Sequence, residues 1–115
     1  MTANPPPTPQ DGLTVDFFVD AGGAPTLVCR GRITVETANL FKAKVKSLTT
    51  EHKYILADLS GVDFVDSFGL GQVLAAYLSA RAVGCEVKLI KVHPRVRDLL
   101  NLSRLASVFE EDAAS

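Results

Sequence analysis

The sequence predicts a single α/β domain with a mixed β-sheet, in the order strand, strand, helix, strand, helix, strand, helix. Its 115 residues, 47% of them hydrophobic, suffice for one core but hardly for two. The spacing of apolar residues changes along the chain from every second residue to every third or fourth and back. Helical crossovers between the later strands require parallel pairing with right-handed connections.

The first part of the chain predicts a tail and a hairpin. Residues 1–12 contain four prolines and few apolar side chains, which predicts a disordered tail and leaves 13–115 as the folded domain. Alternating apolar residues predict a strand over Leu13–Asp20. The two glycines of Asp20–Pro25 indicate a hairpin turn, and Thr26–Ile33 is the expected antiparallel partner strand.

The middle of the chain predicts a helix and a central strand. The helix is expected from Val35 to Leu48, with Thr34 as its N-cap. Its apolar residues are three or four apart and would form one stripe: Ala38, Phe41, Val45 and Leu48. The nearly continuous apolar run Lys53–Leu59 is typical of a strand covered on both faces. Residues 60–65 would connect this strand to the next helix.

A second helix is expected over Phe68–Val83, with Gly84 at its C-terminus. Its apolar residues recur at helical spacing: Leu70, Val73, Leu74, Tyr77 and Leu78. Val87–Ile90 predicts a further strand, and Pro94 opens a third helix. Ala106–Phe109 could add a short edge strand.

Composition argues against several classes of function. Twelve basic and 13 acidic residues give a net charge of −1, so no global field would attract nucleic acid or an anionic membrane. No apolar stretch approaches the roughly 20 residues needed to cross a bilayer. We therefore expect a cytoplasmic protein with no direct nucleic-acid binding and no membrane insertion. Cys29 and Cys85 lie in apolar stretches, where free thiols are expected rather than a disulfide.

The residues that could carry catalysis do not form a recognisable pattern. Ser67 is not in a Gly-x-Ser-x-Gly motif, and His52 lies in a polar turn. His93 precedes Pro94 at a predicted helix start, where it is expected to be a loop residue or a weak cap. No spacing of Cys, His, Asp or Glu predicts a metal site, and no Gly-x-x-x-x-Gly-Lys loop is present. We expect no enzyme activity, no cofactor and no metal.

One six-residue motif stands at the start of the second predicted helix: Asp66-Ser67-Phe68-Gly69-Leu70-Gly71. It resembles the Asp-Ser-x-Gly-Leu-Gly signature of the STAS domain family. Further matches to the family pattern are Ala57-Asp58-Leu59-Ser60, Phe64-Val65, Pro94-Arg95-Val96 and Leu102-Ser103. The resemblance covers roughly residues 13 to 110. The short chain is most similar to the free-standing bacterial members, the anti-sigma factor antagonists.

The resemblance implies a phosphorylation switch. An anti-sigma factor antagonist binds an anti-sigma factor serine kinase while unphosphorylated and is released on serine phosphorylation, which regulates sigma-factor-dependent transcription. The phosphoacceptor would be Ser67, and a serine phosphatase could restore it. The partner-binding residues would be Arg32, Thr34, Asp66, Ser67, Phe68 and Gly69. The alternative is a non-switching STAS subunit of a larger assembly, such as a lipid-transport or stress-sensing complex.

Physical chemistry makes the start of this helix suitable for such a switch. A phosphate on Ser67 would lie near unpaired backbone N–H groups and the positive end of the helix dipole. Gly69 and Gly71 would keep the first turn narrow, so that another protein could approach its backbone closely. The alternative interpretation is that Ser67 is only an N-cap and that the glycines only allow the helix to pack on the sheet.

Two residues depart from the family pattern. Phe68 stands where relatives often carry a second serine or threonine. Its ring would anchor a partner, or it would fold back onto Val35 or another nearby apolar side chain. Thr34 stands where many antagonists carry an aspartate that is associated with kinase contact. Arg32 or Glu36 could contribute instead, although charges at a helix start are often simply solvated.

Overall fold

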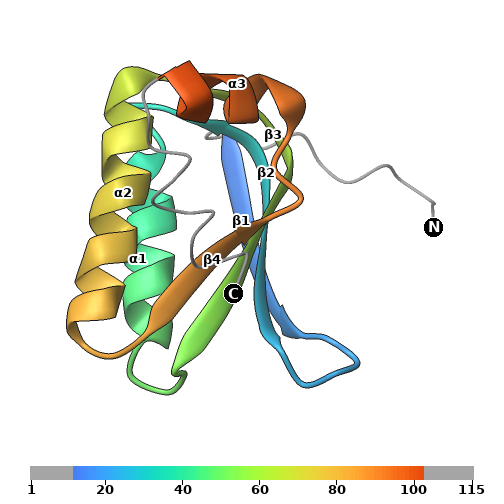
Figure 1. The fold of residues 1–115 in the computed structure, drawn as a ribbon, viewed down its shortest axis with the longest axis vertical. Coiled ribbons are helices and arrows are strands. Elements are labelled where there is room, and N and C mark those ends of the chain that lie inside the picture. The colour runs from blue at the N-terminus through green and yellow to red at the C-terminus, as the bar shows by residue number, and fades with distance from the viewer. Residues whose placement is uncertain (1–11, 103–115) are drawn as a thin grey trace.

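The computed structural model describes residues 12–102, and the expected order of elements is confirmed (Figure 1). The strands are β1 (Leu13–Val19), β2 (Pro25–Ile33), β3 (Tyr54–Val65) and β4 (Glu86–Ile90). The helices are α1 (Ala38–Leu48), α2 (Ser67–Ala82) and α3 (Pro94–Leu102). The edge strand expected over Ala106–Phe109 lies outside the described residues, as does the expected tail except for Gly12.

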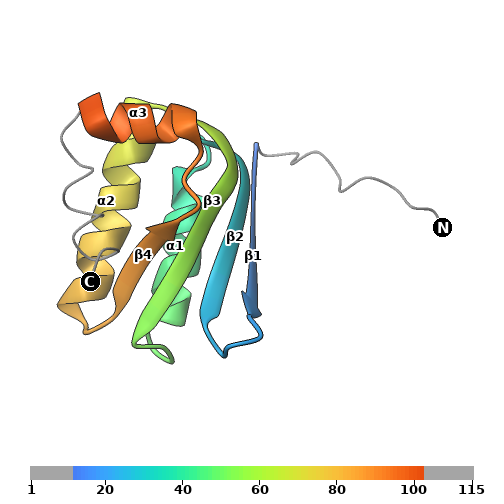
Figure 2. The same cartoon turned by 45° about the vertical axis from the view of Figure 1, so that its right-hand side comes forward.

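The sheet has the strand order β1-β2-β3-β4 and is mixed, as expected. β1 pairs with β2 antiparallel, whereas β2 with β3 and β3 with β4 pair parallel. Figures 1 and 2 show α1 and α2 side by side on one face of the sheet, with α3 across the end where β2 and β3 finish. Parallel strands joined by helices therefore bring the starts of α1 and α2 to one end of the molecule.

The hairpin between β1 and β2 is confirmed. One carboxylate oxygen of Asp20 accepts hydrogen bonds from the backbone amides of Gly22 (2.9 Å) and Ala24 (2.8 Å). Gly23 has a φ of +87°, a backbone conformation that residues other than glycine rarely adopt. Gly12 takes part in the fold as well, because its carbonyl accepts a hydrogen bond from the amide of Arg32 (2.7 Å).

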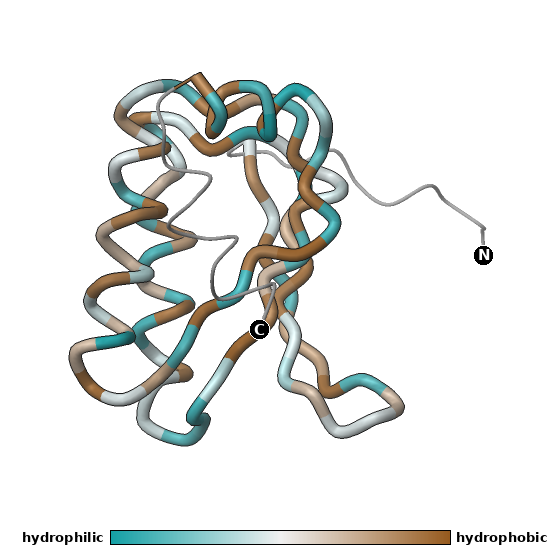
Figure 3. Tube along the Cα trace, in the orientation of Figure 1, coloured by the Kyte–Doolittle hydropathy of each residue, from teal (hydrophilic) through white to brown (hydrophobic). Residues whose placement is uncertain are grey.

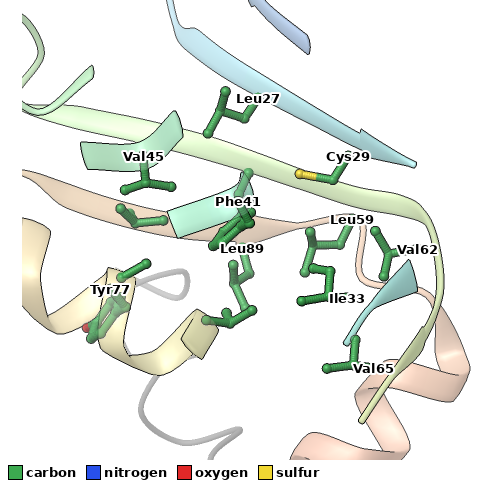
Figure 4. Packing of buried hydrophobic residues seen from close by; sticks show 14 of the residues in the cluster. Leu27, Cys29, Ile33, Phe41, Val45, Leu59, Val62, Val65, Tyr77 and Leu89 are labelled. Carbon is green, nitrogen blue, oxygen red and sulfur yellow. The ribbon is translucent and has the colours of Figure 1, made fainter. Parts of the chain in front are cut away.

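The core lies between the sheet and the helices α1 and α2 (Figure 4). Its largest fully buried side chains are those of Tyr77, Phe41, Leu27, Ile33, Ile55 and Leu59. Both cysteines are buried and free. Burial is the main cause of their raised pKa values, and the pKa of Cys29 is raised to about 12. Among the apolar residues whose spacing predicted α2, Leu78 lies outside the core and is 52% exposed.

β3 is longer than predicted. Residues 60–65, expected as a connector, continue the strand to Val65 and pair parallel with β2. Shifts in the β2–β3 register change the burial pattern after Leu59, so that the alternation of buried and exposed residues ends there. Gly61 lies where a Cβ would crowd the side chain of Arg30 and the carbonyl of Cys29. The sequence pattern was lost because an irregular strand no longer has a period of two.

The start of α1 also differs from the prediction. The helix begins at Ala38 rather than Val35, and the N-cap position is Thr37 rather than Thr34. The hydroxyl of Thr37 donates to the carbonyl of Arg32 (2.7 Å) and accepts from the amide of Thr34 (2.9 Å). The hydroxyl makes no capping bond to the helix, because it bonds instead to backbone groups before the helix. Residues 34–37 therefore form a turn ahead of α1.

Candidate functional site

The candidate site lies at the end of the molecule where β2 and β3 finish. Ile33 and Val65 are paired at the ends of these two strands (Figure 4). This pairing places the turn of residues 34–37 beside the start of α2. The amide of Asp66 donates to the carbonyl of Ile33 (3.2 Å). This hydrogen bond extends the contact between the two strands one residue beyond the end of β3. Only Asp66 separates β3 from α2, so the first turn of α2 is held close to the sheet.

Asp66 joins the two loops through its carboxylate. One oxygen accepts a hydrogen bond from the amide of Gly69 (2.6 Å), which makes Asp66 the N-cap of α2. The other accepts from the amide of Val35 (3.2 Å) in the turn before α1. The carbonyl of Asp66 accepts from the amide of Leu70 (2.8 Å). A negative charge at the positive end of α2 is stabilising, and here it also fixes the neighbouring turn.

Ser67 is the first residue of α2 and is exposed. The interpretation that Ser67 serves as the N-cap is wrong, because Asp66 occupies that position. The cap leaves the serine hydroxyl at the surface, at the end of the helix where the dipole favours added negative charge. This position can carry a phosphate without removing a capping contact.

Phe68 follows at the surface. Its side chain is 48% exposed, so the ring is not buried against Val35, which is itself 59% exposed. Phe64, near the end of β3, is 45% exposed. The site therefore carries three large apolar side chains in contact with solvent, and two of them, Phe64 and Val35, were not predicted as site residues. Their exposure depends on the end of β3 and on the turn before α1, which the sequence pattern did not show.

The two glycines of the motif have different surroundings. Gly69 is buried, and a Cβ there would collide with the backbone carbonyl of Ile33. Gly69 thus allows α2 to approach this chain's own strand β2. The expectation that it allows another protein to approach the helix is wrong for this glycine. A Cβ on Gly71 would meet nothing within 4 Å. Gly69 lies beneath the site rather than on its surface.

Arg32 and Thr34 lie beside Asp66 around a shallow hollow of about 260 Å³. The guanidinium of Arg32 lies over the ring of Phe64, 5.3 Å from its centroid. The hydroxyl of Thr34 accepts a hydrogen bond from the amide of Glu36 (3.2 Å). The predicted residues Arg32, Thr34 and Asp66 are therefore brought together around the hollow, and Ser67 and Phe68 follow Asp66 directly in α2.

The described part of the chain offers no arrangement for metal chemistry. Among residues 12–102, no three His, Cys, Asp or Glu side chains are grouped so that they could hold a metal ion. None of the helices in this range is long and apolar enough to cross a membrane. The features of the site are a capped helix start, an exposed hydroxyl and exposed apolar side chains, and these are suited to recognition by another molecule.

Known proteins resemble this chain in sequence and in fold. The model of the STAS domain family matches residues 19–113. A relative from Thermotoga neapolitana, named as an anti-sigma factor antagonist, is 32% identical over 83 residues, which cover 68% of this chain and 74% of the relative.

Two solved proteins share the fold. An anti-sigma factor antagonist from Mycobacterium paratuberculosis has a TM-score of 0.68 at 24% identity, over 87% of this chain and 85% of that one. SpoIIAA has been solved unphosphorylated, with a TM-score of 0.64 at 20% identity over 80% of this chain and 82% of that one. The phosphorylated form of SpoIIAA, from Bacillus, has a TM-score of 0.60 at 18% identity, over 78% and 83%. The family match spans most of the chain and includes the site, so this protein belongs to the STAS domain family.

Proposed function

We propose that this chain is an anti-sigma factor antagonist that binds an anti-sigma factor serine kinase while Ser67 is unmodified and is released when Ser67 is phosphorylated. The named relatives support the general role. The chain acts as a binding module in the cytoplasm, and its partners supply the chemistry: the kinase transfers the phosphate, and a serine phosphatase removes it. Sigma-factor-dependent transcription is the regulated output.

The observation that carries this proposal is that Asp66, rather than Ser67, caps α2. Asp66 also holds the turn before α1, so the exposed Ser67 is not needed for capping. A phosphoacceptor must be accessible, and its modification must leave the fold intact. The position of Ser67 at the surface supports the first condition, and its place at the positive end of a helix supports the second.

Phosphorylation would change docking rather than folding. The phosphate would add about −1.5 to −2 charges at pH 7 next to the carboxylate of Asp66. It would lie beside Phe68, an exposed ring that could anchor in a pocket of the partner. Burying that charge at an interface would carry a desolvation penalty of several kcal/mol, enough to lower affinity by orders of magnitude.

The experiment compares wild type, Ser67→Ala and Ser67→Asp as affinity baits in the native cell, followed by titration calorimetry with the captured kinase. Wild type and Ser67→Ala should bind, and Ser67→Asp should bind more weakly by orders of magnitude. Mass spectrometry after incubation with the kinase and ATP should find phosphate on Ser67. Phosphate on another residue, or equal binding by the aspartate variant, would contradict the switch.

The same baits distinguish the rival function. A permanent STAS subunit of a lipid-transport or stress-sensing assembly would be captured with the same partners whether residue 67 is serine or aspartate. It would also show no phosphate at Ser67 in the cell. That result would replace the switch by a structural role.

A further inference from the structure

The side of α2 that faces away from the sheet carries no charge along its whole length. α2 packs on the sheet through one side, and Figures 1 and 2 show its other side turned away from the strands. Because each residue turns a helix by about 100°, seven residues share this outer face: Phe68, Gly71, Gln72, Ala75, Leu78, Ser79 and Ala82. All of them are exposed or partly exposed. The solvent side of a surface helix is normally rich in charged residues.

A continuous apolar stripe runs along this outer face. Its members are alternately three and four residues apart: Phe68, Gly71, Ala75, Leu78 and Ala82. The two large side chains are about half exposed, Phe68 by 48% and Leu78 by 52%. Figure 3 shows hydrophobic residues on successive turns of α2. This is the heptad spacing with which helices pack against other helices, and the stripe is about 21 Å long.

The neighbouring helix α1 has a different surface. Its exposed residues include Asn39, Lys46 and Ser47, as expected for a helix in contact with water. The single charged side chain of α2 is that of Arg81, which lies outside the outer face and donates a hydrogen bond to the hydroxyl of Tyr77 (2.8 Å). The apolar surface is therefore confined to α2, and it offers a charged partner nothing to pair with.

We propose that the outer face of α2 binds the same face of a second copy of the chain, with the two helices antiparallel. A twofold axis at Ala75 would bring Phe68 level with the partner's Ala82, and Leu78 close to the partner's Gly71. Large side chains would thus lie opposite small ones. A Cβ on Gly71 would meet nothing within 4 Å, so Leu78 finds room there. Parallel helices would instead set Phe68 and Leu78 against their own copies and leave gaps at the small residues.

The expected dimer is weak and reversible. α2 has 16 residues, so one helix face from each copy forms a small interface, below the total of about 1,600 Å² that is typical of stable complexes. A dissociation constant in the micromolar to submillimolar range follows. The contact is self-complementary, so it closes as a dimer and does not propagate into a filament. The net charge of −1 on each copy hardly opposes it.

Dimerisation would limit access to the candidate site. It would cover Phe68, and the antiparallel alignment would bring Ser67 level with the partner's Val83, which is 67% exposed. The two copies would have to separate before a kinase could dock at Ser67. This consequence rests on the proposed function, whereas the dimer itself does not.

Sedimentation equilibrium of the full chain, without any kinase, tests the dimer. The average mass should rise from that of one chain towards that of two between about 5 µM and about 500 µM. Leu78→Ser should weaken dimerisation about tenfold or more, and the matched Leu40→Ser, at an exposed leucine of α1, should not. A single-chain mass at every concentration, or unchanged dimerisation of the Leu78 variant, would overturn the proposal. A failure of the Ser67 switch would leave this measurement unchanged, so the two failures are distinguishable.

Charges placed at the twofold axis identify the contact. Ala75→Glu and Ala75→Lys should each be monomeric, because like charges would meet, and their equimolar mixture should associate about tenfold or more tightly than either alone. The matched variants Ala43→Glu and Ala43→Lys, on the exposed surface of α1, should dimerise like wild type. Thermal melts confirm that each variant is folded. If the mixture of Ala75 variants stays monomeric, Ala75 does not lie at the axis and the proposal fails.

Single cysteines on the outer face determine the orientation of the helices. Ala75→Cys should form a disulfide-linked dimer under mild oxidation, because a disulfide needs Cα atoms within about 7 Å of each other. Ala82→Cys should not, because antiparallel helices would hold the two copies of this residue about 21 Å apart. The native Cys29 and Cys85 are buried. Cross-linking through residue 82 rather than residue 75 would overturn the antiparallel dimer.

Other occupants of the outer face give different results. If residues 103–115 of the same chain cover it, wild type should stay monomeric, and Leu78→Ser should shift the amide NMR signals of those residues at every concentration. If the face serves only to dock the kinase, wild type should stay monomeric, and Leu78→Ser should lose kinase capture while Leu40→Ser keeps it. Either outcome would overturn the proposed dimer.

Discussion

The starts of α1 and α2 follow neighbouring parallel strands, yet they are built differently. Before α1, residues 34–37 form a turn in which the hydroxyl of Thr37 bonds to backbone groups rather than capping the helix. Before α2, Asp66 alone joins strand to helix and provides the cap. The longer connection helps to form the hollow beside Arg32. The shorter one presses Gly69 against β2 and leaves Ser67 exposed, so the tightness of the second connection determines where the hydroxyl lies.

The largest effect is expected from Gly69→Ala, which tests the tight connection directly. The new methyl group would collide with the carbonyl of Ile33, which belongs to the backbone and cannot rotate away. We expect the free energy of unfolding to fall by about 1 to 3 kcal/mol or more, as in overpacked cores. Denaturant unfolding measures this loss. The matched control is Gly71→Ala, where a Cβ meets nothing, and the chain should become more stable by about 0.5 to 1 kcal/mol. Equal effects would mean that α2 does not approach β2 this closely.

An intermediate effect is expected from Asp66→Ala. Loss of the cap on Gly69 and of the bond from Val35 should lower the free energy of unfolding by about 1 to 2 kcal/mol. Hydrogen exchange should accelerate at the amides of Gly69 and Val35, because both donate to the carboxylate of Asp66. Thr37→Val is the matched comparison and should accelerate exchange at Thr34 while the amide of Gly69 stays protected. A change at Gly69 in the threonine variant would show that the two helix starts are not independent.

The smallest effect is expected from Ser67→Ala. The residue is exposed and the cap belongs to Asp66, so stability should change by no more than about 0.5 kcal/mol. Thermal and denaturant melts of the variant and wild type provide the measurement. A loss near 2 kcal/mol would show that the serine hydroxyl supports the fold, and its availability as a phosphoacceptor would then be in doubt.

Local patterns in the sequence determined most of the elements. The glycines between β1 and β2 predicted the hairpin, because a tight turn needs backbone angles that other residues avoid. Apolar residues three or four apart predicted α1 and α2, because a helix must bury one stripe. Leu78 fits the same spacing, yet it is 52% exposed, since spacing alone does not tell which apolar face of a helix meets the sheet.

The resemblance in the sequence placed the candidate site at Asp66 and Ser67, but only the tertiary structure decided what each residue does there. Asp66 bonds to Val35 and Gly69 lies against Ile33, residues from a distant part of the chain that parallel pairing of β2 and β3 brings near. The contact between Arg32 and Phe64 arises in the same way. A sequence pattern reports the preferences of neighbouring residues, whereas these contacts depend on the register between strands, which is set when the whole sheet packs.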